Sequence, residues 1–477
     1  MAGQSLPERE SFERCFRAAP SEIDVEAIRR EWTALRPPYQ VEDRRLPLPV
    51  WARRGFSETG EQAWAILRQD VAGMDPGKAF CIYLHIPFCA SRCGFCDCYS
   101  FPLRRHKARH VDRYLSLLAQ EARIWSRLGT LSRRPVSTVH LGGGTPTFLG
   151  EEPFGRLVQD LGRCFSMGPH TEWALESTTS ELSDGMVAQL DRLGFTRLHV
   201  GVQSLQDDVR RAIHRREPAT TVLAKIVRAV EMGWVVSVDL ILGLPGQTLK
   251  GVLGDVKALE TAGVDGFSLY ELQLSSRNRR FAERHGLAGQ GRLGSYFLLQ
   301  AASRYLASLG YRKTLFNHFA RQRDTNRYFT FPERGEDCLA LGTIADGVFG
   351  DYHYRHPEYK AYCQRVSEAF PGLQGGLRRS AAENRLHPLE IALLAGRIPV
   401  ELFEDVLGAE RARALFRRWQ ASALVEDDAQ PGHLRLTANG SWFTGKMMAQ
   451  LGSSLARGRR GCVAPRSAHL PEGSKSC

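Results

Sequence analysis

Short apolar runs of strand length alternate with longer amphipathic stretches between residues 81 and 272. The runs are rich in β-branched and aromatic residues, whereas stretches such as HVDRYLSLLAQEARIW and TTVLAKIVRAVEMG repeat their apolar residues at helical spacing. The six runs are CIYLHI, VSTVHL, EWALES, TRLHVGV, VVSVDLIL and GFSLYEL. Strands that alternate with helices pair in parallel through right-handed crossovers, so the pattern predicts an α/β fold. Six repeats favour a partial or full α/β barrel over a doubly wound sheet, and either fold gathers its chemistry at the carboxyl ends of the strands.

The segments before and after these runs lack the alternation. Residues 1–78 hold an amphipathic start and then a passage rich in proline and arginine, LRPPYQVEDRRLPLPVWARRG, which predicts an extended N-terminal arm. We place the barrel at residues 79–320 and a barrel-closing connection at 321–377.

Helical patterns dominate residues 378–455, followed by a short hairpin and a final helix that is N-capped near Thr437 or Asn439. This order predicts a small, winged-helix-like C-terminal domain. Such a domain binds DNA or serves as a lid or packing module of an enzyme, and we favour the second role because no basic residues stand out on its second helix. The polar tail, 456–477, is expected to be disordered.

Composition and charge narrow the class of protein. Of 477 residues, 43% are hydrophobic and 24% are charged, which is typical of a globular protein. The net charge of +12 indicates either an anionic partner or a general preference for arginine, and no aromatic-interleaved basic stripe favours nucleic acid. We find no secretory leader and no apolar run that could span a bilayer, so we expect a cytoplasmic protein with reduced thiols.

Four cysteines crowd into HIPFCASRCGFCDCYS, directly after the first predicted strand. Cys89, Cys93 and Cys96 have the spacing C-x3-C-x2-C, which lets three thiolates converge on one metal site. A structural zinc site requires a fourth ligand and usually a second, separate knuckle, whereas three thiolates on a [4Fe-4S] cluster leave one iron open to a substrate or cofactor. Cys98 is an additional thiol beside them, and the remaining cysteines fit no second cluster spacing.

Polar and glycine-rich residues follow the other predicted strands. LGGGTPTFL follows the second strand, Glu176 ends the third, Gln203 ends the fourth with Arg215 on the next helix, and Asp239 lies on the fifth before LGLPGQT. Each of these residues has a structural explanation by itself, as a turn, a satisfied carboxylate or a surface ion pair. Their shared position at strand ends favours a functional site.

The cysteine loop after YLHIPF, together with GGGTPT, resembles the radical S-adenosylmethionine (radical SAM) superfamily. The order YLHIPFC, GGGTPT, GVQS, DLILGLPGQT and LALGTIADGVFG over about residues 80 to 360 resembles its oxygen-independent coproporphyrinogen III oxidase branch. The resemblance implies a partial (β/α)6-type TIM barrel, a [4Fe-4S] cluster on Cys89, Cys93 and Cys96, and two SAM molecules bound side by side. It assigns Tyr83, Gly143 and Glu176 to the first SAM, and Gly144, Thr145, Gln203, Arg215 and Asp239 to the second, and it matches Cys98 to a cysteine that does not bind the cluster.

The branch hosts several reactions. The arm here reads DRRLPLPVW where the oxidase has an Arg-Tyr-Thr-Ser-Tyr-Pro pattern, and GSWFTGKMMAQL does not match the oxidase either. We therefore expect methyl or methylene transfer from the second SAM to an sp2 carbon of a planar or natural-product substrate, including cyclopropane formation. Decarboxylation of coproporphyrinogen III, anaerobic opening of haem, haem chaperoning and, outside the superfamily, a zinc-stabilised DNA-binding regulator are the alternatives.

The resemblance also assigns roles. Gln203, Arg215, Asp239 and Cys98 are expected to take part in catalysis, and a flavodoxin or ferredoxin to supply electrons. His199 and His318 are candidate proton handlers, and Tyr270 and Glu271, at the end of the sixth predicted strand, are candidate substrate contacts.

Overall fold

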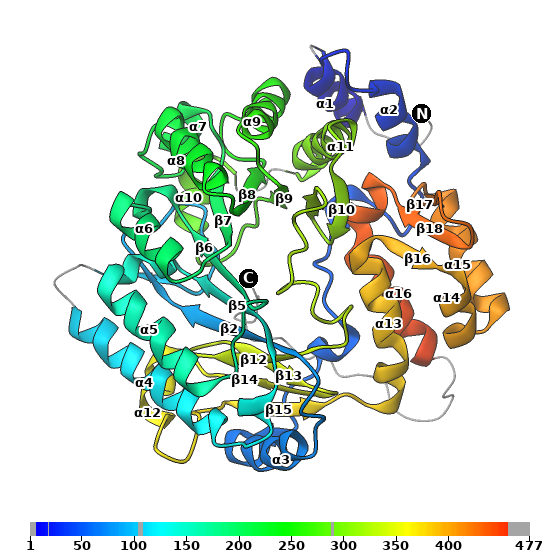
Figure 1. Ribbon diagram of the computed structural model, residues 1–477. Helices are drawn as coiled ribbons and strands as arrows, with labels where there is room; N and C mark the ends of the chain where they lie inside the picture. Colours follow the sequence, from blue (N-terminus) through cyan, green and yellow to red (C-terminus); the bar gives the residue numbers. More distant parts are fainter. Residues whose placement is uncertain (1–5, 18, 104–107, 288–290, 457–477) are drawn as a thin grey trace.

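A single large sheet forms the centre of the computed structural model, which describes residues 6–17, 19–103, 108–287 and 291–456 (Figure 1). All six predicted strands are present and pair in parallel in chain order, which confirms the α/β partial barrel. They are β2 (Phe80–Ile86), β5 (Val136–Gly143), β6 (Glu172–Ser177), β7 (Arg197–Gln203), β8 (Val235–Leu242) and β9 (Gly266–Glu271). Their apolar side chains are almost all buried, as continuous apolar runs in a parallel sheet require.

The segment 321–377 does not close the barrel but extends the sheet. Its strand β12 (Asp337–Leu341) adds in parallel beside β2, and β13 (Asp346–Phe349), β14 (Tyr352–Arg355) and β15 (Gly375–Arg378) follow as an antiparallel meander, with α12 (Tyr359–Arg365) before β15. At the other edge, β11 (His318–Ala320) pairs with β9, and β10 (Arg312–Leu315) pairs with β11. The two outermost strands, β1 and β10, are not paired with each other in the described chain, so the barrel stays open.

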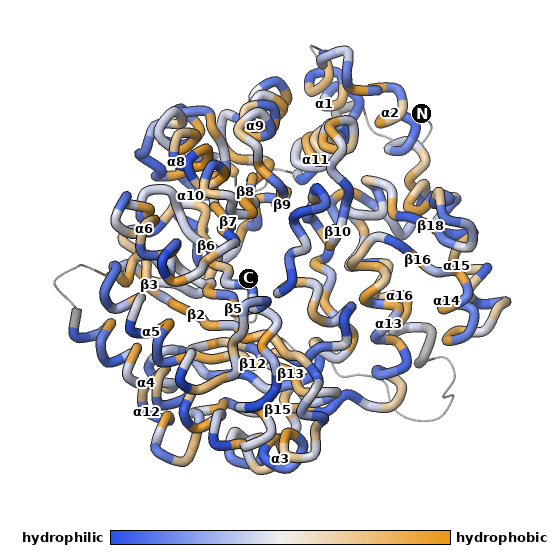
Figure 2. The backbone as a smooth tube through the Cα atoms, in the orientation of Figure 1, coloured by the Kyte–Doolittle hydropathy of each residue, from blue (hydrophilic) through white to orange (hydrophobic). Residues whose placement is uncertain are grey.

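Helices cover the outer side of the curved sheet (Figure 1). Along these helices hydrophilic and hydrophobic stretches alternate in the hydropathy colouring, as amphipathic helices require (Figure 2). The first predicted helical stretch falls within α4, and the second, residues 220–233, matches α8 but runs two residues past its end. The helices of this region are α4 (Ala108–Ser126), α5 (Glu151–Cys164), α6 (Asp184–Arg192), α7 (Asp207–Ala212), α8 (Ala219–Glu231), α9 (Leu249–Thr261), α10 (Arg279–Arg284) and α11 (Leu293–Ser308).

The N-terminal arm is helical at both ends and irregular only between them, so the prediction of an extended arm is wrong for its ends. It contains α1 (Leu6–Phe16), α2 (Val25–Ala34) and α3 (Gly60–Ala72), with the short strand β1 (Glu58–Thr59) paired to β15. A capping box between Thr59 and Gln62 begins α3, and this signal was readable in the sequence. The helices α1 and α2 depend instead on tertiary packing, because the Phe12 ring stacks on Trp32 at 5.3 Å and meets Phe297 of α11 edge-on at 5.2 Å.

The C-terminal domain has the predicted order of helices, hairpin and final helix. Thr437 begins the last helix, since its hydroxyl accepts a hydrogen bond from the Gly440 amide at 3.0 Å. The three short strands form one antiparallel sheet in the order β16, β18, β17. The elements are α13 (Ala381–Ala395), β16 (Arg397–Pro399), α14 (Val400–Leu407), α15 (Ala409–Ala421), β17 (Val425–Asp427), β18 (His433–Leu436) and α16 (Ala438–Ala456).

Two expectations about the chain as a whole remain. The tail predicted at 456–477 lies, apart from its first residue, outside the described residues. Among the helices of the described chain, none combines the length and the apolar character needed to cross a bilayer.

A buried ion-pair network lies inside the barrel. Asp324 is fully buried, with one carboxylate oxygen 2.6 Å from Arg197 Nη1 and the other accepting hydrogen bonds from Ser237 and bonding to His318 Nε2 at 2.7 Å. Burial alone would raise the pKa of Asp324, but the Arg197 guanidinium and His318 hold that pKa below its usual range. The carboxylate is therefore charged in the folded protein.

Replacing this carboxylate should destabilise the barrel. In Asp324→Ala, the buried Arg197 guanidinium loses its counter-charge, and we expect the free energy of unfolding to fall by about 3–5 kcal/mol, measured by urea denaturation. The control is Asp208→Ala, because Asp208 pairs with Arg211 on the surface with 92% of its side chain exposed, and this variant should stay within about 0.5 kcal/mol of wild type. Equal midpoints for the two variants would contradict the structural role of the network.

Candidate active site

The cysteine loop borders a cavity of about 660 Å³ at the carboxyl ends of the barrel strands. The loop leaves β2 and is fixed at both ends by β3 (Phe88–Cys89), which pairs with β4 (Phe101–Pro102). Of the residues that the resemblance assigned to the cluster, to SAM or to the adjacent thiol, all except Tyr83 line this cavity: Cys89, Cys93, Cys96, Cys98, Gly143, Gly144, Thr145, Glu176, Gln203, Arg215 and Asp239. The structure therefore brings together residues that span about 150 positions of the sequence.

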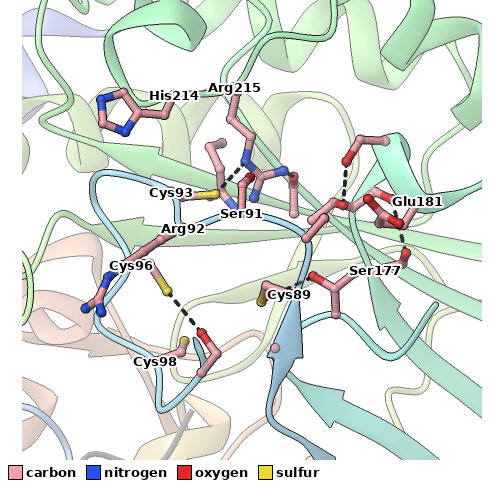
Figure 3. Close-up of a pocket in the computed structure, with 18 of the residues that line it drawn as sticks. Cys89, Ser91, Arg92, Cys93, Cys96, Cys98, Ser177, Glu181, His214 and Arg215 are labelled. Carbon is pink, nitrogen blue, oxygen red and sulfur yellow. Dashed lines mark hydrogen bonds between the residues drawn. The ribbon is translucent and has the colours of Figure 1, made fainter. Parts of the chain in front are cut away.

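The four half-buried thiols form no disulfide, and Cys89, Cys93 and Cys96 each have a polar side chain of the site beside them (Figure 3). Thr145 Oγ1 lies 3.6 Å from Cys89 Sγ, Arg215 Nε lies 3.1 Å from Cys93 Sγ, and Ser100 Oγ lies 3.9 Å from Cys96 Sγ. A hydrogen bond with Cys98 and burial raise the pKa of the Cys96 thiol, and burial raises that of Cys89. Cys89 and Cys96 therefore favour their protonated form in the folded chain, and binding of iron to them would release protons.

The donor set fits an iron–sulfur cluster. No three cysteine, histidine or carboxylate side chains of the described residues converge tightly enough to hold a single metal ion. A cluster needs a different arrangement, because each thiolate binds its own iron, and the three thiols on one loop face one common cavity. Gly144 makes room beside them, since a Cβ atom there would lie 3.0 Å from Cys89 Sγ and 2.6 Å from the Phe88 carbonyl oxygen.

Two carboxylates of the cavity are each held by a histidine of the neighbouring strand. Glu176 accepts a hydrogen bond from His140 Nε2 at 3.0 Å, and its other oxygen accepts from the Gly143 amide at 3.3 Å. Asp239 bonds His199 Nε2 at 2.5 Å. Burial would raise the pKa of Glu176, but the bond from His140 lowers it overall, so Glu176 is charged and ready to accept hydrogen bonds from a ligand.

His199 is a buried residue that lines the cavity and uses only one of its two ring nitrogens in a hydrogen bond among the described residues. Its Nδ1 atom has no hydrogen-bond partner within the part of the chain that is described. Burial lowers the pKa of His199, but the charge and hydrogen bond of Asp239 outweigh burial and raise it. The nearby charged or titratable groups are Asp239, Glu176, Arg197, His318 and Asp324, and the two carboxylates closest to the ring favour its protonated form.

Several predicted residues lie outside the cavity. Tyr83 packs behind it, with its ring stacked on Tyr328 and its hydroxyl 3.0 Å from His85 Nδ1, so its contact with SAM stays a prediction. His318 lies in the Asp324 network below the cavity and does not line it. The substrate-contact predictions gain no support, because Glu271 forms a buried ion pair with Arg44 of the arm at 2.9 Å and Tyr270 also does not line the cavity.

Other lining residues were missed or placed differently. Arg215 lies in the connection after α7, which ends at Ala212, and not on the helix. The run from Ser177 to Glu181 after β6 and the residues His214 and Arg216 also line the cavity. The run was signalled in the sequence only by its position at a predicted strand end, and His214 and Arg216 only by their place beside Arg215.

Comparisons with known proteins agree with this geometry. The family model described as "Radical SAM superfamily" matches residues 83–259. The chain is 32% identical over 342 residues to oxygen-independent coproporphyrinogen III oxidase of Escherichia coli (strain K12), covering 68% of this chain and 72% of that protein. It is 26% identical to anaerobilin synthase of Escherichia coli O157:H7 over 86% of this chain and 91% of that protein. The solved coproporphyrinogen III oxidase from Escherichia coli has the same fold, with a TM-score of 0.71 and 24% identity over 83% of this chain and 94% of that chain.

Alanine substitutions should separate the three predicted cluster ligands from Cys98. We expect Cys89→Ala, Cys93→Ala or Cys96→Ala to abolish cluster assembly after anaerobic reconstitution, because each removes one iron ligand. Cys98→Ala should retain most of its iron. Iron and sulfide analysis and the visible absorption spectrum measure the cluster content of all four variants. Loss of iron in Cys98→Ala equal to that in Cys96→Ala would refute this ligand assignment.

The His199–Asp239 pair should make stability depend on pH. A raised pKa in the folded state stabilises the protein at low pH, and this contribution is lost as pH rises through the folded-state value. At pH values below the ordinary histidine pKa of about 6.5, the free energy of unfolding of wild type should therefore exceed that of His199→Gln by about 1–3 kcal/mol. This difference should shrink toward alkaline pH. Urea unfolding across this pH range measures the gap, and His170→Gln, at an exposed histidine, is the control. A gap that widens with pH would show the opposite linkage.

Proposed function

The chain belongs to the oxygen-independent coproporphyrinogen III oxidase branch of the radical SAM superfamily, and we propose that within this branch it opens the ring of haem. The observation that carries the proposal is the length of the similarity to anaerobilin synthase, 86% of this chain and 91% of that protein. A bilin is an opened tetrapyrrole, so that name denotes ring opening. The matched part of the chain is longer than the barrel and its connection together, residues 79–377. It therefore includes part of the arm or of the C-terminal domain.

Two neighbouring ligand positions in the cavity support a reaction that uses two SAM molecules. The cluster, when bound, would be held by Cys89, Cys93 and Cys96 and would supply the electron that cleaves SAM. Glu176 on β6, kept charged by His140, offers carboxylate oxygens to an amino group or to ribose hydroxyls. Asp239 on β8, together with Gln203 and Arg215, offers a second polar set in the same cavity.

The neighbouring groups of this second set are aligned by the backbone. Gln203 ends β7 with φ of 69°, and its Oε1 atom is buried without a partner among the described residues, which leaves it free to accept a hydrogen bond from a ligand. Arg215 donates to the Gly201 carbonyl oxygen at 3.0 Å, and this bond fixes its guanidinium between β7 and Cys93. His199 holds the Asp239 carboxylate in one orientation and can hold a proton beside it.

Decarboxylation of coproporphyrinogen III is the second candidate. The chain has a higher identity, 32%, to the oxidase than to anaerobilin synthase, although over a smaller share of its length. The absence of the oxidase's tyrosine-containing pattern from the arm favours ring opening over this reaction. Methyl or methylene transfer, our expectation from the sequence, gains no support from these relatives, because neither is named a methyltransferase.

Turnover with two substrates distinguishes these reactions. The reconstituted enzyme is incubated anaerobically with reductant, SAM deuterated in its methyl group, and either haem or coproporphyrinogen III. We expect SAM-dependent loss of the haem absorption band and an open tetrapyrrole by mass spectrometry. Loss of carboxyl groups from coproporphyrinogen with haem intact would establish the oxidase reaction instead, whereas haem binding without SAM cleavage would indicate a chaperone. Deuterium in the tetrapyrrole product would revive methyl transfer.

A matched pair of variants tests the site itself. Asp239→Asn should lower the rate of haem consumption about a hundredfold, because it removes the charge that orients His199 and the second ligand, while iron content stays at the wild-type level. Asp208→Asn, at an exposed position on α7, should leave the rate unchanged. Wild-type turnover in Asp239→Asn would remove this carboxylate from the proposed site.

A further inference from the structure

Two arginine-rich segments adjoin the cysteine loop. The segment 209–216 contains four arginines and no acidic residue, and the segment 277–284 contains four arginines and one acidic residue, Glu283. Both segments belong to neighbouring parts of the fold, the end of α7 and the helix α10. In the first segment Arg210 is buried against backbone carbonyls, Arg211 pairs with Asp208 and Arg215 lines the cavity. These contacts leave Arg216 of the first segment, and Arg279, Arg280 and Arg284 of the second, as exposed cations.

Contacts join the two segments to the loop that carries the predicted cluster ligands. The Gly94 amide donates to the Ile213 carbonyl oxygen at 3.2 Å, and Arg92 Nη2 donates to the Arg277 carbonyl oxygen at 3.0 Å. Phe281 of α10 packs so closely on the loop that a Cβ atom at Gly94 would lie 2.5 Å from its ring. Loop, α7 end and α10 therefore form one continuous surface.

The cations of this surface are available to a partner. Five exposed arginines have no carboxylate of any described residue within 4.0 Å, and we name them the loop arginines: Arg92, Arg216, Arg279, Arg280 and Arg284. Glu283 is the single acidic residue of the α10 segment, and Asp208 of α7 is already paired with Arg211. Leu274, an apolar side chain that is 42% exposed, lies in the segment just before α10. A basic patch next to an exposed apolar residue is typical of a protein-docking surface.

Two of the five loop arginines lie at the cavity that the thiols border. Arg92 and Arg216 also line the cavity, and Arg215, next to Arg216 in the chain, contacts Cys93 Sγ through its guanidinium (Figure 3). A protein bound to this surface would rest against the loop that holds the predicted cluster ligands. Since electron transfer slows steeply with distance, this is a favourable place from which to deliver an electron.

We propose that the loop arginines form the docking surface for an acidic one-electron donor protein. One electron passes from the reduced donor to the oxidised cluster, so the donor is oxidised by one electron and the cluster reduced by one, and no bond forms or breaks. Opposite charges steer such an encounter and raise its rate, and salt screens the effect. The inference rests on the cluster implied by the family and not on the choice of tetrapyrrole reaction.

Charge reversal tests the surface without touching the cavity. The test variant is Arg279→Glu/Arg280→Glu on α10, and the control is Arg411→Glu/Arg417→Glu, which makes the same charge change at exposed positions of α15. Cluster-loaded enzyme without any tetrapyrrole is mixed with a reduced acidic flavodoxin as the probe, and cluster reduction is followed by stopped-flow absorbance. We expect the test variant to be reduced about tenfold more slowly than wild type and control at low salt, with the difference vanishing at high salt.

Reduction by dithionite separates docking from damage to the cluster. This small reductant needs no docking surface, so all three proteins should be reduced by it at the same rate. Equal flavodoxin rates for test variant and control, or a defect of the test variant that dithionite shares, would overturn the proposal. Unchanged flavodoxin rates with weakened tetrapyrrole binding would also overturn it and assign the arginines to substrate carboxylates. Because no tetrapyrrole is present in the rate measurement, failure of the ring-opening proposal leaves this test unaffected.

Discussion

The parallel register of the barrel strands places one row of polar side chains along the inner face of the sheet. Tyr83 lies opposite His140, Glu176 opposite His199, and Asp239 opposite Gly201. Side chains alternate between the two faces of a strand, so a shift of one residue in any of these pairings would turn a carboxylate away from the cavity. The same hydrogen-bond ladder that builds the sheet therefore determines which groups meet at its carboxyl end.

A row of buried polar groups is stable only if each group finds a partner, and here most of the partners come from within the row and from the layer beneath it. His140 and His199 each bond a carboxylate on the adjacent strand, and Arg197, two residues before His199, pairs with Asp324 below. This second layer contains no cavity residue, yet it fixes the strands that carry them. The cost of burying these charges is thus offset within the barrel, and the cavity carboxylates remain available to ligands.

The sequence predicted what local pattern and strand order determine. Long apolar runs identified all six barrel strands, and residues at the strand ends identified the cavity, because a parallel fold gathers these ends at one edge. Four-residue strands such as β14 carry too few residues to reveal a period, so the meander after β12 was missed. Tyr83 and Glu271 were misplaced with respect to the cavity for another reason, since the side chains that engage them, Tyr328 and Arg44, lie far away in the sequence.

Arg44 shows why the barrel motifs alone do not select the reaction. Its guanidinium is buried between Glu271, at the end of β9, and the ring of Trp442 in α16, whose plane it overlies at 4.3 Å. One side chain of the arm thereby joins the barrel edge to the C-terminal domain, and burial of its charge requires Glu271 to stay paired rather than to meet a substrate. The motifs that carry the resemblance to the branch lie within residues 80 to 360, whereas this junction is built from the arm and the last helix. The residues that surround the barrel edge at Glu271 therefore come from parts of the chain that those motifs do not describe.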